Sequence, residues 1–384
     1  MLTVRAEVIV SVRMTWCPTI PHLLGAGGSG RSWSACTYDQ TIDGALVVSK
    51  TMTLPKASAF PLSAISAKGA TTKTAVGTAI RGGDTVLILQ MKGDKAGYYT
   101  KVLVAGAAGT SIQFASDVNA ALFKASDLLV VQRVPVYTTV TVNSGGVLQG
   151  QSWDGTKTGV LAFEAQSVTV NNGGKINADG FGYKGGASNS YTGRVHSGES
   201  YCTNSNPSVG GPRSQKGSCG AGGGGDHHAG RYSGAGGGGG YGGGGQTGKQ
   251  DTGEGRGFGG STYGGDLTKQ LFLGSGGGGG SENNNNSQGR GGSGGGIIAI
   301  WSKVTSIKGT ISARGNTGTH TKSGARDGGG AGAGGSVYIT GATCTKSGGS
   351  INVGGGGWSN GGQTSGQSSG GAGGSGRTKV PSGC

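Results

Sequence analysis

Apolar and polar residues alternate in two segments of this chain that repeat each other. Val140 to Gly150 reads VTVNSGGVLQG, and Val168 to Ala178 reads VTVNNGGKINA. Valines at every second position predict strands with one face turned inward, and the Asn and Gly residues permit sharp turns. Repeats of this size predict a solenoid, because one unit cannot bury its apolar face without a stacked neighbour.

The same pattern returns after a block of glycine. TISARG begins at Thr310 and SINVGG at Ser350, preceded by GIIAI and GSVYI respectively. We expect three short strands in the second repeat, over Val160–Glu164, Val168–Val170 and Ile176–Ala178. The inward side chains of the later repeats are expected to be Ile297, Ile300, Val304, Ile307, Ile311 and Ala313 in the third and Val337, Ile339, Cys344, Ile351 and Val353 in the fourth.

The segment 49–137 has a different pattern, with β-branched runs divided by glycine-containing turns. Such runs predict conventional strands. They cover Asp84–Lys92, Tyr98–Val104, Thr110–Phe114 and Leu128–Val134. We interpret the segment as a small β domain or as the cap that closes one end of the solenoid.

Glycine dominates the segment 181–295, with uninterrupted runs such as Gly236–Gly240 and Gly276–Gly280. Such a segment is either a flexible linker or a polyglycine II bundle, in which chains without Cβ atoms approach closely. We favour the bundle, because the insertion separates two repeats that stack and its ends are therefore held together.

These patterns divide an all-β chain into five parts. They are an irregular segment 1–48, the β domain 49–137, the first coils 138–180, the glycine-rich insertion 181–295, and further coils with a glycine-rich tail over 296–384. Composition agrees, since 91 of the 384 residues are glycine and only 6% are aromatic. An ordinary packed globule contains far less glycine.

The charge is basic and thinly spread, with a formal net charge of +15 on a chain that is 13% charged. This balance favours an anionic partner, such as polysaccharide or an extracellular matrix polymer. Self-association is left open, and no motif predicts a cofactor.

The six cysteines fit disulfides better than a metal site, since none forms a CxxC pair. They are Cys17, Cys36, Cys202, Cys219, Cys344 and Cys384. Cys202 with Cys219, and Cys17 with Cys36, frame short loops, but six cysteines allow 15 pairings. An even number in a chain with little apolar core indicates an oxidising compartment.

The start of the chain carries no clear secretion signal. Arg5, Glu7 and Arg13 interrupt the apolar residues around VIVSV, so no signal-peptide core is present. No stretch has the length of a membrane span. We therefore expect an extracellular or cell-surface protein on the rest of the chain, and we hypothesise a truncated or misplaced start.

GDTVLILQMKG, the VTVN turn and the GIIAI…GTISARG…GSVYI tail together resemble glycine-rich predicted β-helical regions of secreted and cell-surface proteins. The glycine block is also similar to the polyglycine II tips of phage tail-fibre adhesins. The first resemblance covers roughly residues 50–380 and the second only 181–295. Both imply an extracellular structural or adhesive role, with binding loops projecting from a glycine scaffold, and neither brings catalytic residues.

Three kinds of chemistry compete with adhesion. Asp226, His227 and His228 with His196 suggest zinc or copper, but adjacent side chains of an extended chain point apart, so a solvated loop is favoured. A polysaccharide-active β-helix enzyme requires paired carboxylates, for which Asp154, Glu164 and Asp179 are the acids near the coils. RNA binding is suggested by Arg290-Gly291-Gly292, without any folded RNA-binding signature.

Ice binding is a fourth alternative, because regular β-helix faces can display threonine arrays. Thr138, Thr139, Thr141 and Thr169 are present, but Ser306 and Thr310 do not align with them as a Thr-x-Thr ladder in the sequence. Adhesion is therefore favoured over ice binding.

The sequence predicts a noncatalytic extracellular structural or adhesive protein. Its glycine scaffold is expected to display basic and aromatic side chains that bind glycan or matrix polymer, with Arg231, Tyr232, Tyr241 and Arg256 as candidates. A phage or bacterial receptor-binding adhesin is the alternative.

Overall fold

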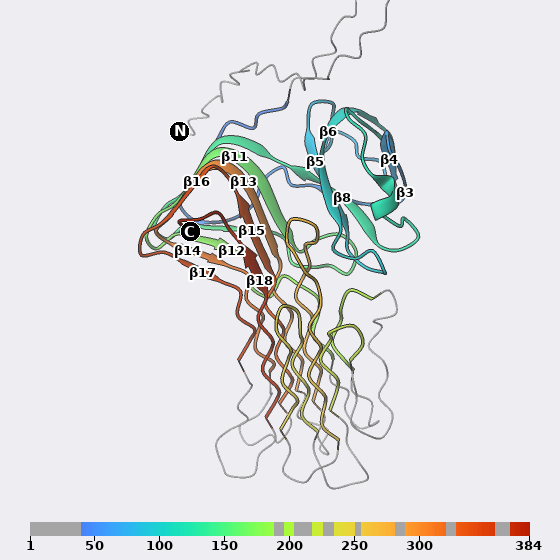
Figure 1. Ribbon diagram of the computed structural model, residues 1–384, viewed down its shortest axis with the longest axis vertical. Helices are drawn as coiled ribbons and strands as arrows, with labels where there is room; N and C mark the ends of the chain where they lie inside the picture. The colour runs from blue at the N-terminus through green and yellow to red at the C-terminus, as the bar shows by residue number, and fades with distance from the viewer. Residues whose placement is uncertain are drawn as a thin grey trace, which may run out of the picture.

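The structure is a computed structural model. It describes residues 40–187, 196–202, 217–225, 234–249, 255–280, 289–319, 328–357 and 369–384. These residues form an all-β protein without α-helices, apart from a short 3-10 turn over Ala120–Leu122. Figure 1 shows three parts: a barrel, a pair of parallel sheets beside it, and glycine-rich segments that extend away from the sheets.

The long parallel sheet follows the order β1-β9-β11-β13-β15-β18, with β16 also paired to β13. Each repeat contributes in turn to this sheet, so neighbouring strands are neighbouring repeats. The strands are β1 (Ala45–Val48), β9 (Val136–Val142), β11 (Val160–Val170), β13 (Ile297–Ile307), β15 (Ser336–Thr340), β16 (Thr343–Lys346) and β18 (Arg377–Lys379).

The short parallel sheet takes one strand from each repeat, in the order β17-β14-β12-β10-β2. Leu148, Ile176 and Ile311 lie side by side in it, and none of the three is exposed. The strands are β2 (Thr51–Thr53), β10 (Val147–Gln149), β12 (Lys175–Asn177), β14 (Thr310–Ser312) and β17 (Ser350–Asn352).

The register confirms the alignment that the sequence repeats predict. Val168 and Val170 of β11 pair with Val140 and Val142 of β9. All four side chains belong to one core between the two sheets. The structure also adds a repeat that the sequence analysis missed, because β1 pairs with β9 and β2 with β10. The segment 1–48 is thus not irregular throughout.

Two expectations about the repeats were wrong in detail. β11 is a single strand, because its pairing continues through the bend at Gln166 that was expected to separate two strands. In β13 the inward side chain is Thr305, fully buried, while Val304 is 46% exposed. The bend shifts the alternation by one residue, and the Thr305 hydroxyl is satisfied by Ser302 Oγ at 2.6 Å.

The prediction for the start of the third repeat was also wrong, because Ile297 was expected to point inward. Ile298 and Ile300 point into the core between the sheets, whereas Ile297 packs on the outer side against the barrel. In the fourth repeat, Val337 and Ile339 are buried as expected.

The segment 49–137 contains a closed barrel, in the order β3-β4-β7-β6-β5-β8. All four strands that the sequence predicted there are present, together with two more. The barrel strands are β3 (Ala59–Ser66), β4 (Gly69–Thr72), β5 (Thr85–Gln90), β6 (Tyr99–Ala108), β7 (Ser111–Phe114) and β8 (Leu129–Val134). The chain therefore inserts the barrel between its first and second repeats.

The barrel packs against the outer face of the long sheet (Figure 1). Leu87 and Val130 of the barrel share an apolar cluster with Ala162 and Ala299 of β11 and β13. Small alanine side chains on the sheet allow this close approach, and Leu273 from the glycine-rich insertion completes the cluster. The barrel thus covers one side of the stack rather than its end.

The glycine segments are held together by backbone hydrogen bonds. The backbone N–H groups of the segment 274–280 donate to three different neighbouring segments. Residues that are three positions apart donate to the same segment. The donors and acceptors are Gly274 to Gly295, Gly277 to Gly292, Gly276 to Glu199, Gly279 to His196 and Gly278 to Gly237. Bonds in three directions pack the segments into a bundle rather than a sheet.

Glycine is required in this bundle by contact. A Cβ atom on Gly277 would overlap the backbone of Gly330, and one on Gly278 would overlap that of Gly223. The bundle also takes in glycine segments that follow β14 and β17, since Gly332 donates to Asn316 and Gly356 donates to Gly332. It therefore extends beyond the segment 181–295.

Candidate functional site

The four predicted ligand-binding residues do not form one surface in the structure. Arg231 and Tyr232 lie outside the described residues. Arg256 is exposed, next to buried glycines of the bundle. Tyr241 is fully buried. Its expected role at an exposed binding surface is therefore replaced by a role in the core.

Tyr241 belongs to an aromatic cluster between the bundle and the long sheet. Its ring lies 5.0 Å from the Tyr263 ring and 5.9 Å from the Phe272 ring. Tyr201 completes the cluster, with its ring 4.7 Å from that of Tyr263. The Tyr241 hydroxyl lies 2.8 Å from Ser336 Oγ of β15. Burial raises the pKa of Tyr241 to about 12, against the opposing effect of that hydrogen bond.

Two disulfides bind the chain at the bundle and at its C-terminus. Cys202 pairs with Cys219, as their spacing suggested, with Cα atoms 6.0 Å apart. Cys344 of β16 pairs with the C-terminal Cys384, with Cα atoms 5.3 Å apart. Both separations suit disulfide geometry. Cys17 and Cys36 lie outside the described residues.

The metal hypothesis gains no support from the residues that are described. Asp226, His227 and His228 lie outside them, and within the described ranges no three His, Cys, Asp or Glu side chains gather. His196 accepts a bundle hydrogen bond through its carbonyl group, from the N–H of Gly279.

The three acids considered for catalysis each have structural partners. Asp154 Oδ1 accepts bonds from the backbone N–H groups of Thr156 and Lys157 at 2.8 and 2.9 Å. Burial raises the pKa of Asp154, but these bonds outweigh burial and lower it overall. Such an acid fixes a turn in its own loop.

Asp179 joins two repeats of the short sheet. It accepts hydrogen bonds from Lys175 Nζ at 2.6 Å, from Ser312 Oγ at 2.5 Å and from the Arg314 N–H at 2.7 Å. These bonds outweigh the effect of burial and lower the pKa of Asp179. Glu164 lies in the long sheet instead, so the structure does not pair these two carboxylates.

Glu164 lies in a half-buried group where the barrel meets the long sheet. Lys101 Nζ of β6 is 2.5 Å from Glu164 Oε2 and 4.9 Å from the centre of the Trp301 ring. Tyr338 places its ring 6.3 Å from both Trp301 and Tyr99. An ammonium between a carboxylate and an indole face is well stabilised. Strand register places Glu164 beside Trp301, and packing of the barrel on the sheet brings Lys101 and Tyr99 to them, so sequence reasoning missed the group.

A second ion pair joins the barrel to the bundle. Lys92 Nζ is 2.6 Å from Glu199 Oε1, and Trp153 Nε1 donates to Glu199 Oε2 at 2.8 Å. The Lys92 ammonium also lies 5.7 Å from the centre of the Tyr183 ring. Lys92 and Trp153, which are distant from each other in sequence, therefore both bind one carboxylate of the bundle.

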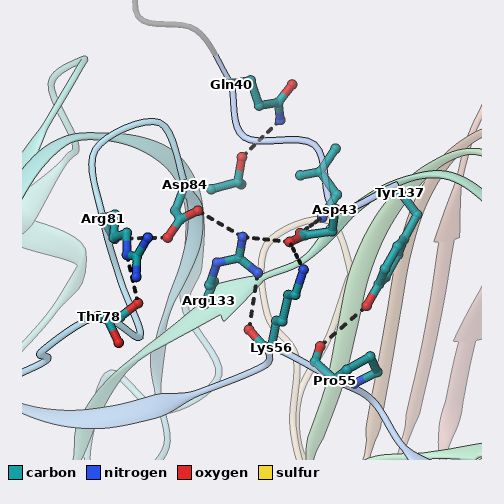
Figure 2. A network of polar contacts seen from close by, with 11 residues as sticks. Gln40, Asp43, Pro55, Lys56, Thr78, Arg81, Asp84, Arg133 and Tyr137 are labelled. Carbon is teal, nitrogen blue, oxygen red and sulfur yellow. Dashed lines mark hydrogen bonds and ion pairs between the residues drawn. The ribbon is translucent and has the colours of Figure 1, made fainter. Parts of the chain in front are cut away.

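Figure 2 shows a buried network at the joint between the barrel and the sheets. Arg133 Nη2 of β8 donates to Asp43 Oδ1 at 3.0 Å and to Asp84 Oδ1 at 2.9 Å. Lys56 Nζ is 3.3 Å from Asp43, whose other oxygen accepts the Val136 N–H. Burial lowers the pKa of Arg133, but the hydrogen bonds to Asp84 and Asp43 raise it overall. The network ties the chain segment that leads into the barrel to the strand by which the chain leaves it.

A small cavity lies beside this joint, lined by Thr53, Gln132, Thr158 and Val160 among others. Its volume of about 20 Å³ is comparable to the space needed by one water molecule. It is too small for a sugar.

The part of the chain that the structure describes contains no helix with the length and hydrophobicity of a membrane span.

Comparison with protein-family models, curated proteins and solved structures finds no match for this chain. Among the described residues, the polar clusters join the barrel, the sheets and the bundle to one another.

Proposed function

We propose that this is a noncatalytic extracellular protein with a structural or adhesive role. Its two parallel sheets are the faces of a β-solenoid, and its glycine segments form a polyglycine II bundle at the solenoid's flank. The observation that carries this proposal is the period of three in the bundle's hydrogen bonds. Extended chains with three residues per turn present N–H groups in three directions.

The bundle is suited to holding loops at a distance from the solenoid. Gly280 and Gly289 are bridged where two antiparallel glycine segments end, and the bundle extends away from the parallel sheets (Figure 1). The sequences between such segments are rich in polar residues, including Arg231 and Tyr232 between Gly225 and Gly234. A rigid scaffold lowers the entropy cost when its loops bind a ligand.

An extracellular location is supported by the two disulfides, since such bonds persist in oxidising compartments. The formal charge of +15 favours an anionic glycan or matrix polymer as the partner. A noncatalytic role is supported by the three acids near the coils, each of which already holds a structural partner.

A phage or bacterial receptor-binding adhesin would use the same scaffold. Genes for tail or secretion components beside the coding sequence would favour it over a matrix protein. RNA binding is less favoured, because Gly291 and Gly292 of the RGG sequence that begins at Arg290 donate backbone hydrogen bonds within the bundle.

The proposal is tested by glycan-array binding of the full chain with its disulfides intact. We expect binding to sulfated or carboxylated glycans that is lost in the Arg231→Ala/Tyr232→Ala double variant. Lys73→Ala is the control, because it removes an exposed cation from the barrel. Binding that is unchanged in the double variant, or no binding to any glycan, would contradict the adhesive role.

A further inference from the structure

The long parallel sheet has a second outer surface, beyond the bend that separates it from the barrel. It is formed by β1, β9, β11, β13 and β16, which pair in parallel and in register. Residues that alternate with the core point outward there. One row consists of Ala45, Thr139, Ser167, Val304 and Thr343. The second row consists of Val47, Thr141, Thr169, Ser306 and Thr345.

These rows revise the expectation that no threonine ladder continues into the later repeats. Ser306 is in register with Thr169, and Thr345 is in register with Ser306. Val304 was expected to point inward, which would place Ser306 inward as well. Because Val304 points outward, Ser306 also points outward and continues the ladder. The strand pairing, not the spacing of threonines along the chain, defines the array.

The surface is open to solvent and its two rows carry no charge: six of the ten residues are exposed and the other four are half-buried. Val47 is 61% exposed and Val304 is 46% exposed, and these are the large apolar side chains that the described part of the protein leaves most open to solvent. No lysine, arginine, aspartate or glutamate occupies either row, although the chain carries a formal charge of +15. β16, at one edge of the surface, lies on the side of the sheets away from the barrel (Figure 1).

The rows are regular in both directions. Paired strands lie about 4.8 Å apart, and outward residues on one strand repeat at about 6.6 Å. Threonine and valine are branched at Cβ and have few rotamers within a strand, so their methyl and hydroxyl groups are held in fixed positions. The short sheet offers a contrast, since its outward positions mix Lys175, Gln149 and Asn177.

We propose that this surface, defined as the Thr/Ser/Val face, binds ice. Its chemistry fits a neutral, repeating lattice of water, because hydroxyl groups bond to lattice oxygens while methyl groups occupy the spaces between them. A charged mineral or an anionic polymer would require charges opposite to its own, and a sugar polymer would favour aromatic rings. Neither is present in the two rows. This proposal does not depend on the glycine bundle's loops.

The test is partition of the purified full chain into slowly grown ice. We expect the native protein to be enriched in the ice relative to the remaining liquid, and Thr169→Tyr to abolish this enrichment. Tyrosine is favoured in strands, so the variant is expected to keep its fold, which circular dichroism checks.

Two further variants make the test specific. Thr310→Tyr places the same ring on the outer face of the short sheet and is expected to leave enrichment unchanged. Ser306→Thr extends the ladder and is expected to retain enrichment. Exclusion of the native protein from ice, or equal enrichment of the folded native and Thr169→Tyr proteins, would overturn the proposal. The Arg231→Ala/Tyr232→Ala variant should still enter ice, which separates this proposal from the glycan-binding one.

Discussion

Ile311 lies beside Ile176 in adjacent parallel strands, although the entire glycine-rich insertion separates them in sequence. Both side chains are fully buried in the same core. The stack of repeats therefore continues across the insertion as if it were absent. This continuity is possible only if the inserted chain leaves and returns at neighbouring positions, as the antiparallel glycine segments allow.

The core position of Ile311 predicts a large effect of its truncation. Ile311→Ala is expected to lower the free energy of unfolding by about 2–5 kcal/mol, because it leaves a cavity in a packed interior. Val304→Ala should change it by about 0.5 kcal/mol or less, since Val304 is 46% exposed. Denaturant unfolding of the two variants measures both. Equal effects would show that the side-chain directions in these strands are misassigned.

The tight packing of the bundle predicts that single methyl groups disrupt it. Gly277→Ala is expected to destabilise the protein by about 1–3 kcal/mol, because the new Cβ overlaps the backbone of Gly330 and something must shift. Gly265→Ala is the matched control, since its Cβ would meet no atom closer than 4.0 Å. Thermal unfolding midpoints compare the two. A Gly277→Ala midpoint equal to that of the control would argue against close-packed glycine segments.

The disulfides are expected to stabilise the fold unequally. In the chain-entropy model a loop of 40 residues between Cys344 and Cys384 contributes about 4 kcal/mol, and one of 17 residues between Cys202 and Cys219 about 3 kcal/mol. The Cys344→Ser/Cys384→Ser variant should therefore unfold at lower denaturant concentration than Cys202→Ser/Cys219→Ser. Cys344 is also buried, which adds to the difference. The reverse order would contradict this prediction.

Buried tyrosines predict a loss of stability in alkali. The pKa of Tyr241 is about 12 when folded and about 10 when exposed, so the unfolded chain releases its proton first. The stabilisation that arises from the raised pKa of Tyr241 is fully present below pH 10, and it is expected to be lost between pH 10 and about 12. Unfolding free energies across this range, with tyrosine absorbance to follow ionisation, test the sign. A Tyr241→Phe variant should show a shallower decline than the native protein.

Much of the fold follows from the sequence because the pattern VTVN-x-GG is the same in two consecutive repeats. The alignment of Val140 with Val168 appears in the structure without a shift. The first repeat was missed because its turn consists of Ser49 and Lys50 and lacks the Asn-Gly signal. Closure of the barrel was also not predicted, since pairing of β3 with β8 joins distant residues.

The candidate site was harder to predict than the fold. Tyr241 was predicted to be displayed by the glycine scaffold as a ligand-binding residue, but it is buried among aromatic rings. The Thr/Ser/Val face depends on a one-residue shift at the bend, and no periodicity in the sequence marks that shift. In both cases the decisive contacts join residues that are far apart in the sequence.

The repeats are expected to stack without interruption across the glycine insertion also in solution. Nitroxide labels at Lys175→Cys and Thr310→Cys measure this, in a protein that also carries Cys17→Ser and Cys36→Ser. These positions are paired in adjacent strands, about 5 Å apart, so electron paramagnetic resonance should show strong dipolar broadening. A spectrum equal to the sum of the two singly labelled proteins would contradict the account, because a flexible insertion would hold the labels tens of ångströms apart.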